Sequence, residues 1–587
     1  MTWSYLLSVG VAVCVCLCWG ESLHGDSSQY PPRELLDKLA SKVIPGVHPF
    51  DEDNDGVNKN IVCDMCEVYV TFIQLWFQKG KTQDEIVTLA THLCIDLKSA
   101  SDRICRLATR EFKDEVLGVV GQLALSPTEV CGIIMGPSCD IPYNPDQWWN
   151  VSLPSTPKPP VLPPRPPAPS SPKLRMLHLT DIHIDLMYEV GSNTDCGEPV
   201  CCRSNDGKPA PGVSGAGRWG DYRECDVSMS LVNTLFQHLA TIKDQFDFVI
   251  FTGDIPAHDV WNQTRSQQIA ATQRLTKLFL QHLPGKQVYF CVGNHESAPV
   301  NSFPPPEVTG NNSISWLYTV LAESWGTWLP EDARHTILKG AYYSVSPYPG
   351  FRIVSINTNY CNQGNWWLLL NRTDPADQLT WLTHVLQEAE DAGEKVFILT
   401  HIPPGKDNCL KPWSWNYYRI VNRYESTIMA QFYGHTHKDQ FEVFYDDVNF
   451  TRPTSIGYVM GGVTTRGDLN PSYRIYTMDG NYKTSSWAVL DFETYYTDIA
   501  TANKGQAAPV WLLEYTAKSD YNMTGLYPRD WSDLIYRMRD DDTVFQKFYK
   551  LFYKLRDNGP CTGHCKTKML CELKTGRSRD PALCSDL

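Results

Sequence analysis

The stretch FDFVIFTGDIPAHD, Phe246 to Asp259, decides the fold of this 587-residue chain. Its residues as far as Phe251 form a short apolar run, rich in aromatic and β-branched residues, which predicts a buried strand. Gly253 then permits a sharp turn and leaves Asp254 at the carboxyl end of that strand, with His258 four residues further on. Open α/β sheets bind their ligands at that edge. Because Gly-Asp is also a common turn, a site is predicted only if other strands end in matching residues.

Four other predicted strands end in residues of the same chemical kind. The oxygen and nitrogen donors that follow them are Asp181, His183, Asn294, His295, His401, His435 and His437. Imidazole, carboxylate and amide oxygen together suit borderline divalent metals such as Zn²⁺, Mn²⁺ or Fe²⁺. Cysteine is missing from the set, which disfavours a structural zinc site. A lone histidine is usually a satisfied core or surface residue, but so many donors at five successive strand ends indicate a metal centre.

The order of the predicted elements indicates the fold class. Strands alternate with helices from Leu174 onward, and the later part, up to about residue 500, is mostly strands. This pattern predicts an α/β fold with two sheets packed face to face and helices outside. We expect single helices over residues 103–124 and 528–555.

The first 22 residues predict a secretory signal peptide, because Leu6 to Trp19 is apolar and small residues follow. No later apolar run reaches the roughly 20 residues of a membrane span, so no transmembrane anchor is expected. Seventeen of the twenty cysteines remain after cleavage, which indicates disulfides and an oxidising compartment. The net charge is −14, and a chain this acidic lacks the basic surface that binds nucleic acid, so no nucleic acid partner is expected. Six N-x-S/T sequons predict exposed glycan sites at Asn150, Asn262, Asn311, Asn371, Asn449 and Asn522.

The chain divides into four parts after the signal peptide. Residues 59–143 form a compact unit with apolar residues at helical spacing and six cysteines, which permit fifteen pairings. Residues 153–173 form a proline-rich linker, expected to be an extended, semi-rigid spacer. The strand-rich part, 174–500, is the predicted catalytic domain. Residues 501–587 form a predicted helical, cysteine-containing C-terminal region.

The first of these units resembles the saposin B-type family in its paired early cysteines, central pair and late pair around an apolar four-helix pattern. The resemblance implies the disulfides Cys63–Cys139, Cys66–Cys131 and Cys94–Cys105, and a helical leaf that opens onto lipid. The alternative is a disulfide-stapled helical domain that binds nothing. The aromatic residues near one helix end, Phe72, Trp76 and Phe77, favour lipid contact.

The motifs D-x-H, G-D, G-N-H-E, a single H and G-H-x-H, in this order, resemble the calcineurin-like metallophosphoesterase family. The resemblance implies two metal ions and attack on phosphorus by a hydroxide between them. The implied ligands of the first ion are Asp181, His183, Asp254 and His437. Those of the second are Asp254, Asn294, His401 and His435. His295 is then the leading candidate for the general acid and His258 the second, with an orienting role as the alternative for His258.

Taken together, the four parts resemble the acid sphingomyelinase family. The resemblance implies two Zn²⁺ ions and hydrolysis of sphingomyelin to ceramide and phosphocholine by a monomer, in lysosomes or after secretion. It implies peripheral contact with anionic-lipid membranes through the saposin-like domain. Purple acid phosphatases are excluded, because Ala257 stands where they use a tyrosine. The further implied disulfides are Cys196–Cys201, Cys202–Cys225, Cys361–Cys409, Cys561–Cys565 and Cys571–Cys584, which leave Cys291 as a buried free thiol.

Aromatic residues are candidates for binding the choline of such a substrate, because aromatic faces attract quaternary ammonium groups. The candidates near the predicted site are Tyr360, Trp366, Trp367, Trp413, Trp415, Tyr417, Tyr418 and Tyr473, most of which we expect to serve in packing. Two other functions stay open. One is a phosphodiesterase for nucleotides or other soluble phosphoesters, and the other is a secreted lipid-binding protein with an inactive site. The complete set of metal donors argues against the second.

Overall fold

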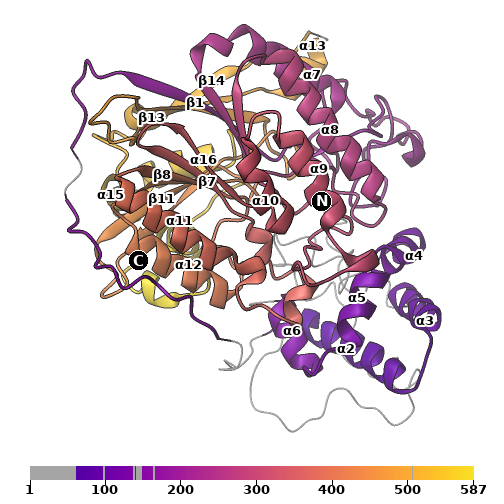
Figure 1. Cartoon of the computed structure of the whole chain (residues 1–587). Helices are drawn as coiled ribbons and strands as arrows, with labels where there is room; N and C mark the ends of the chain where they lie inside the picture. Colours follow the sequence, from indigo (N-terminus) through magenta and orange to yellow (C-terminus); the bar gives the residue numbers. More distant parts are fainter. Residues whose placement is uncertain (1–60, 97–99, 136–138, 140–147, 163–164, 506) are drawn as a thin grey trace.

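The computed structural model describes residues 61–587 except 97–99, 136–138, 140–147, 163–164 and 506 (Figure 1). The predicted signal peptide, residues 1–22, lies outside the described residues. Within the part of the chain that is described, no helix combines the length and apolar character needed to cross a membrane.

A helical unit lies at one end of the molecule (Figure 1). Its helices are α2 (Ile61–Gln78), α3 (Gln83–Asp96), α4 (Asp102–Glu111), α5 (Lys113–Val120) and α6 (Pro127–Met135). The single helix expected over residues 103–124 is wrong, because the backbone leaves helical geometry at Phe112 (φ −87°, ψ 0°). The break lets α5 turn away from α4 and pack against η8 (Trp366–Leu369) of the larger unit. Three disulfides cross-link the helices, namely Cys63–Cys139, Cys66–Cys131 and Cys94–Cys105.

Two six-stranded sheets form the core of the larger unit, so the predicted α/β fold with two facing sheets is confirmed. The first sheet has the order β14 (Leu512–Thr516), β13 (Val489–Tyr496), β12 (Ser472–Asp479), β1 (Lys173–Leu179), β4 (Phe248–Phe251) and β5 (Gln287–Phe290). The second has the order β10 (Gln440–Tyr445), β11 (Pro453–Val459), β9 (Ile428–Tyr433), β8 (Lys395–Leu399), β7 (Phe351–Ser355) and β6 (Tyr343–Tyr348). A separate short pair joins β2 (Ile184–Asp185) to β3 (Val227–Ser228).

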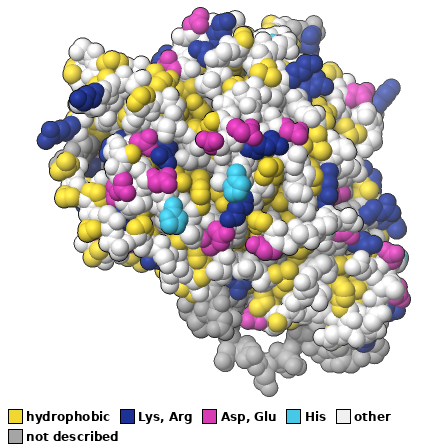
Figure 2. Space-filling model, viewed as in Figure 1, with side chains coloured by type: hydrophobic (Ala, Val, Ile, Leu, Met, Phe, Trp, Pro, Cys, Tyr) yellow, Lys and Arg dark blue, Asp and Glu magenta, His cyan; other side chains and the backbone are white. Residues whose placement is uncertain are grey.

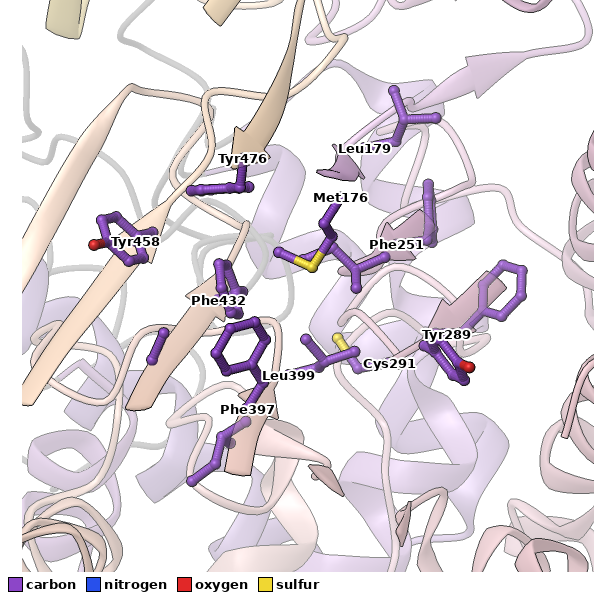
Figure 3. Packing of buried hydrophobic residues seen from close by; sticks show 14 of the residues in the cluster. Met176, Leu179, Phe251, Tyr289, Cys291, Phe397, Leu399, Phe432, Tyr458 and Tyr476 are labelled. Atoms are coloured by element: carbon purple, nitrogen blue, oxygen red, sulfur yellow. The ribbon is translucent and has the colours of Figure 1, made fainter. Parts of the chain in front are cut away.

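Buried apolar side chains from both sheets meet between them (Figure 3). Met176 of β1 and Tyr476 of β12 come from the first sheet, while Leu399 of β8 and Phe432 of β9 come from the second, and the rings of Tyr476 and Phe432 are in contact. All four are at most 1% exposed. Burial of such residues contributes about 25 cal/mol for each Å² removed from water, so this layer holds the two sheets in fixed relation.

Helices surround the sheets (Figure 1). Those up to the last strands are α7 (Met229–Thr241), α8 (Arg265–His282), α9 (Ser315–Trp325), α10 (Glu331–Gly340), α11 (Gln378–Ala392) and α12 (Lys411–Arg423). The helix α7 begins where the Ser228 side chain accepts a hydrogen bond from the backbone N–H of Leu231 (3.2 Å). It buries Leu235 and Leu239, one turn apart, toward the sheet.

The C-terminal region is built into the larger unit. Its strand β14 pairs with β13 and completes the first sheet. Its helices are α13 (Ile499–Gly505), α14 (Ala517–Asp520), α15 (Pro528–Asp540), α16 (Asp542–Phe552) and α17 (His564–Lys574). The single helix expected over residues 528–555 is wrong, because Asp541 is extended and its side chain caps α16 by accepting from Thr543 N (2.8 Å). Two disulfides, Cys561–Cys565 and Cys571–Cys584, close the tail.

The proline-rich segment is not a free spacer along its whole length. Just before the segment, Val151 N donates a hydrogen bond to Asn416 of α12 (2.8 Å), and within it the carbonyl of Thr156 accepts a hydrogen bond from Arg423 (3.0 Å). Lys158 forms an ion pair with Glu425 (2.5 Å). The segment therefore lies along α12 and its C-terminal end before it enters β1.

On the face shown in Figure 2, acidic and basic side chains are mixed rather than gathered by sign.

Candidate metal centre

Five strands from two different sheets deliver the predicted donors to one place. The strands β1, β4 and β5 run parallel in the first sheet, and β8 and β9 run parallel in the second. Parallel strands end at the same edge, so the loops after all five meet where the two sheets face each other. The structure brings together there all seven residues predicted as metal ligands.

The first half of the cluster is formed by two aspartates and two histidines. The Nε2 atom of His183 lies 3.6 Å from Oδ2 of Asp254 and 4.0 Å from Oδ1 of Asp181. The Nε2 atom of His437 lies 3.5 Å from the same Asp181 oxygen and 3.0 Å from Nε2 of His183. Four donor atoms thus surround one small volume that is shielded from solvent.

The second half shares Asp254 with the first. The Nε2 atom of His401 lies 3.1 Å from Oδ2 of Asp254 and 3.0 Å from Oδ1 of Asn294. The Nδ1 atom of His435 lies 3.0 Å from the same Asn294 oxygen. One carboxylate oxygen, Oδ2 of Asp254, therefore faces histidines of both halves.

The hydrogen bonds around the cluster leave lone pairs pointing inward. His183 donates its Nδ1 hydrogen to the carbonyl of Pro256 (2.8 Å), and His401 donates its own to the carbonyl of Thr252 (2.6 Å). In a neutral imidazole the other nitrogen then carries a lone pair. Burial lowers the pKa of His183 and of His437 well below 6.5, and that of His435 to about 3, which favours the neutral form. At His401 burial is outweighed by the charge and hydrogen bond of Asp254, which raise the pKa to about 9, so a cation bound there would have to displace a proton from this ring. Facing lone pairs and carboxylate oxygens at these distances fit divalent cations.

The backbone at the cluster is held in an uncommon conformation. Positive φ angles occur at Asp181 (47°), His183 (46°), Asp254 (62°), His435 (75°) and His437 (59°). Each such non-glycine residue costs on the order of 1–3 kcal/mol, and such residues gather at functional sites. Five of the seven predicted ligands are thus in a conformation that the surrounding fold must hold in place.

Two motif glycines are required by close approach to the ligands. A Cβ atom on Gly293 would lie 2.2 Å from Oδ1 of Asp254. A Cβ atom on Gly434 would lie 2.2 Å from Oγ1 of Thr180 and 2.5 Å from Oδ2 of Asp181. Real Cβ atoms do not approach other atoms so closely, so any side chain at either position would displace a ligand.

The two predicted acid–base histidines lie beside the first half of the cluster. The His258 ring stacks on that of His183 with centroids 3.8 Å apart, and the His295 ring lies 4.6 Å from that of His258. The backbone N–H of His295 donates to Oδ1 of Asp254 (2.9 Å). Burial lowers the pKa of His295 to about 4.

Asp226 is a functional candidate that the sequence reasoning missed. Both of its oxygens contact His258, one at the backbone N–H (2.6 Å) and the other at Nδ1 (2.6 Å). Burial opposes ionisation of Asp226, but the charge and hydrogen bond of His258 hold the pKa of the carboxyl well below its usual value. A single aspartate after a cysteine carries no local signal, because its partner lies 32 residues away.

Tyr473, predicted to contact substrate, is not brought to the cluster. Its side chain is fully buried in β12, its hydroxyl lies 2.8 Å from Nε2 of His238, and its ring stacks on that of Tyr495. The alternation of the strand turns this residue toward α7, which corrects the expectation. Of the other aromatic candidates, all but Trp415 are buried in packing.

The remaining predicted positions lie as follows. The larger unit contains the disulfides Cys196–Cys201, Cys202–Cys225 and Cys361–Cys409. Cys291 is buried and unpaired within the described residues. The sequon asparagines are all exposed, namely Asn150, Asn262, Asn311, Asn371, Asn449 and Asn522.

Comparison with known proteins adds to this geometry. A family model described as calcineurin-like phosphoesterase matches residues 174–439, and one described as acid sphingomyelin phosphodiesterase C-terminal region matches residues 448–578. A Homo sapiens protein named sphingomyelin phosphodiesterase is 46% identical over 534 residues, covering 90% of this chain and 83% of that protein. A Caenorhabditis elegans protein named sphingomyelin phosphodiesterase 2 is 35% identical over 592 residues, covering 97% and 94%. A Homo sapiens protein named acid sphingomyelinase-like phosphodiesterase 3b is 30% identical over 418 residues, covering 68% and 87%.

Proposed function

The chain belongs to the acid sphingomyelinase family of calcineurin-like phosphoesterases, and from this we propose that it hydrolyses sphingomyelin to ceramide and phosphocholine. The observation that carries the proposal is the pair of donor sets that share Oδ2 of Asp254. Such a pair suits two cations close together, as used to cleave phosphoesters. The named relatives supply the substrate class.

Zinc is the proposed metal at both positions. Asp181, His183, Asp254 and His437 would hold one ion, and Asp254, Asn294, His401 and His435 the other. Imidazole nitrogen provides four of the seven ligands, which suits Zn²⁺ better than Mg²⁺ or Ca²⁺. When bound, two such ions offset the charge on phosphoryl oxygens and lower the pKa of the water that attacks phosphorus.

His295 and His258 are proposed to supply the proton that the departing ceramide oxygen needs. Asp226 accepts the Nδ1 hydrogen of His258 and so fixes the orientation of the ring, which leaves Nε2 of His258 free to exchange a proton. His295 lies beside His258 and is tied to Asp254 through its backbone N–H, which places its ring next to the cluster. We assign delivery of the proton to His295, and its resupply from the neighbouring ring to the His258–Asp226 pair.

The two histidines give a prediction of their own. Replacing either His295 or His258 by Gln is expected to lower kcat by about 10²–10⁴-fold, the usual contribution of a positioned acid or base. Zinc content should stay unchanged, because neither residue is a proposed ligand. Steady-state kinetics with zinc analysis on the purified variants checks this.

Asp226→Asn serves as the companion variant. It should lower kcat, because the Nδ1 hydrogen of His258 loses its carboxylate partner and the ring is no longer held in one orientation. Unchanged kcat in both Asp226→Asn and His258→Gln would remove these two residues from the proton path, and unchanged kcat in His295→Gln would remove His295.

The helical unit is proposed to be a saposin B-type domain that gives the enzyme access to lipid. Phe72 and Trp76 stack on each other and are buried inside the unit, where an opening of the helices would present them to a bilayer. Disulfide pairing of every described cysteine except Cys291 supports a lysosomal or secreted location.

The proposed function is tested by phosphodiesterase assay of the full chain with zinc at mildly acidic pH. Sphingomyelin in anionic vesicles should be cleaved, and ATP should be a poor substrate. Release of phosphocholine would be measured against a chelator-treated sample, which should be inactive and recover when zinc is restored. Cleavage of ATP without cleavage of sphingomyelin would overturn the proposal in favour of a soluble phosphoester as substrate.

A further inference from the structure

The histidines of the cluster differ in what holds their outer ring nitrogens. His183 and His401 donate to the backbone carbonyls of Pro256 and Thr252, so the course of the main chain sets their orientation. The outer nitrogen of His435, Nε2, instead meets a side chain, the amide of Asn408, at 2.7 Å. The orientation of the His435 ring therefore depends on the side chain of Asn408, and a substitution of Asn408 would remove this contact.

The hydrogen-bond needs of both groups decide which amide atom faces His435. For Nδ1 of His435 to offer a lone pair beside Asn294, Nε2 must carry the ring hydrogen. Oδ1 of Asn408 is buried and has no hydrogen-bond partner among the described residues. A half-turn of the amide places this oxygen on the Nε2 hydrogen, so that the buried oxygen and the ring N–H pair with each other where an unmade hydrogen bond costs about 1–3 kcal/mol.

The backbone around Asn408 is tied down on both sides. The carbonyl of Asn408 accepts a hydrogen bond from Gln363 N (2.8 Å), and the next residue, Cys409, is bonded to Cys361. The N–H of Leu410 donates to the carbonyl of Cys361 (2.7 Å). The disulfide loop thus holds the amide against His435 from outside the cluster.

We propose that Asn408 is a positioning residue for the second metal ion. Its amide oxygen keeps the hydrogen of His435 on Nε2 and so presents Nδ1 to the ion, while the Cys361–Cys409 disulfide keeps Asn408 in place. The inference rests on the proposed two-zinc centre and adds to it a residue outside the ligand set. Partners of this kind usually change metal affinity by about 10–100-fold.

The test compares zinc binding by the full chain and its variants in a chelator competition, without substrate. Asn408→Ala should lower the affinity for one of the two zinc ions by about 10–100-fold and leave the affinity for the other unchanged. Asn408→Asp should restore most of the affinity, because a carboxylate oxygen accepts the same hydrogen bond. Asp407→Ala is the matched control, since this neighbouring side chain is exposed and should change nothing.

The outcomes separate this inference from the proposed function. If the wild-type chain binds fewer than two zinc ions, the two-metal centre itself fails. If it binds two and Asn408→Ala binds both as tightly, the role of Asn408 is overturned. Two other results would also overturn it: an equal loss of affinity for both ions in Asn408→Ala, or a loss in Asn408→Asp as large as that in Asn408→Ala. In either case a general loosening of the loop would explain the loss.

Discussion

Asp254→Asn is expected to abolish phosphodiesterase activity, lowering kcat/KM by about 10³-fold or more. The reason is that Oδ2 of Asp254 faces His183 in one half of the cluster and His401 in the other. A neutral amide is a poor bridge between two cations, so the loss should reach about 4 kcal/mol of transition-state stabilisation. Kinetics on sphingomyelin vesicles and a count of bound zinc are the measurements.

A matched control separates this effect from general damage. Asp244→Asn removes one carboxylate from an exposed position shortly before the same strand and should leave activity and zinc binding unchanged. Retention of two zinc ions and of activity within tenfold in Asp254→Asn would contradict the shared-ligand arrangement.

The second large effect concerns Glu115, which lies at the seam between the helical unit and the larger unit. Glu115 is on α5 and only 3% exposed, next to Ser302 and Trp366 of the larger unit, beside a cavity of about 340 Å³. Burial raises the pKa of Glu115 to about 8, and the nearby hydroxyl and backbone oppose this only in part. Burial likewise raises the pKa of Glu111, on the same side of the seam, to about 7, with Asp259 adding to it.

The sign of the pH dependence follows from these shifts. A carboxyl whose pKa is raised in the folded chain costs nothing below its ordinary value of about 4.5. Above that value the unfolded chain loses its proton and the folded chain resists, so stability falls as pH rises toward about 8. The packing of the helical unit against the larger unit should therefore contribute most to the stability of the chain under acidic conditions, and least at neutral pH and above.

Glu115→Gln tests this directly. The variant should match the wild type at pH 4.5 and be more stable at pH 8, by on the order of 4 kcal/mol if the whole shift is realised. Denaturant unfolding of the full chain at both pH values measures the difference. Asp114→Asn, at the exposed neighbouring position, is the control and should show no such pH dependence. A difference between Glu115→Gln and wild type that is equal at both pH values would contradict the assignment.

The sequence by itself determined the sheets and the donor set. The strands that carry the donors are short apolar runs ending in polar motifs, so local pattern alone located Asp181, Asp254, Asn294, His401 and His435 at strand ends. Parallel strands of a sheet end at one edge, which is why residues more than 250 positions apart could be expected at one site.

Only the tertiary structure decided what surrounds those donors. The contacts of Asp226 with His258, of Asn408 with His435 and of Glu115 with the larger unit join elements whose distance in space no periodicity encodes. The breaks at Phe112 and Asp541 and the burial of Tyr473 were likewise missed, because each depends on which face packing turns inward. Helix and strand patterns record which residues avoid water, whereas the partner of a buried polar group depends on how finished elements meet.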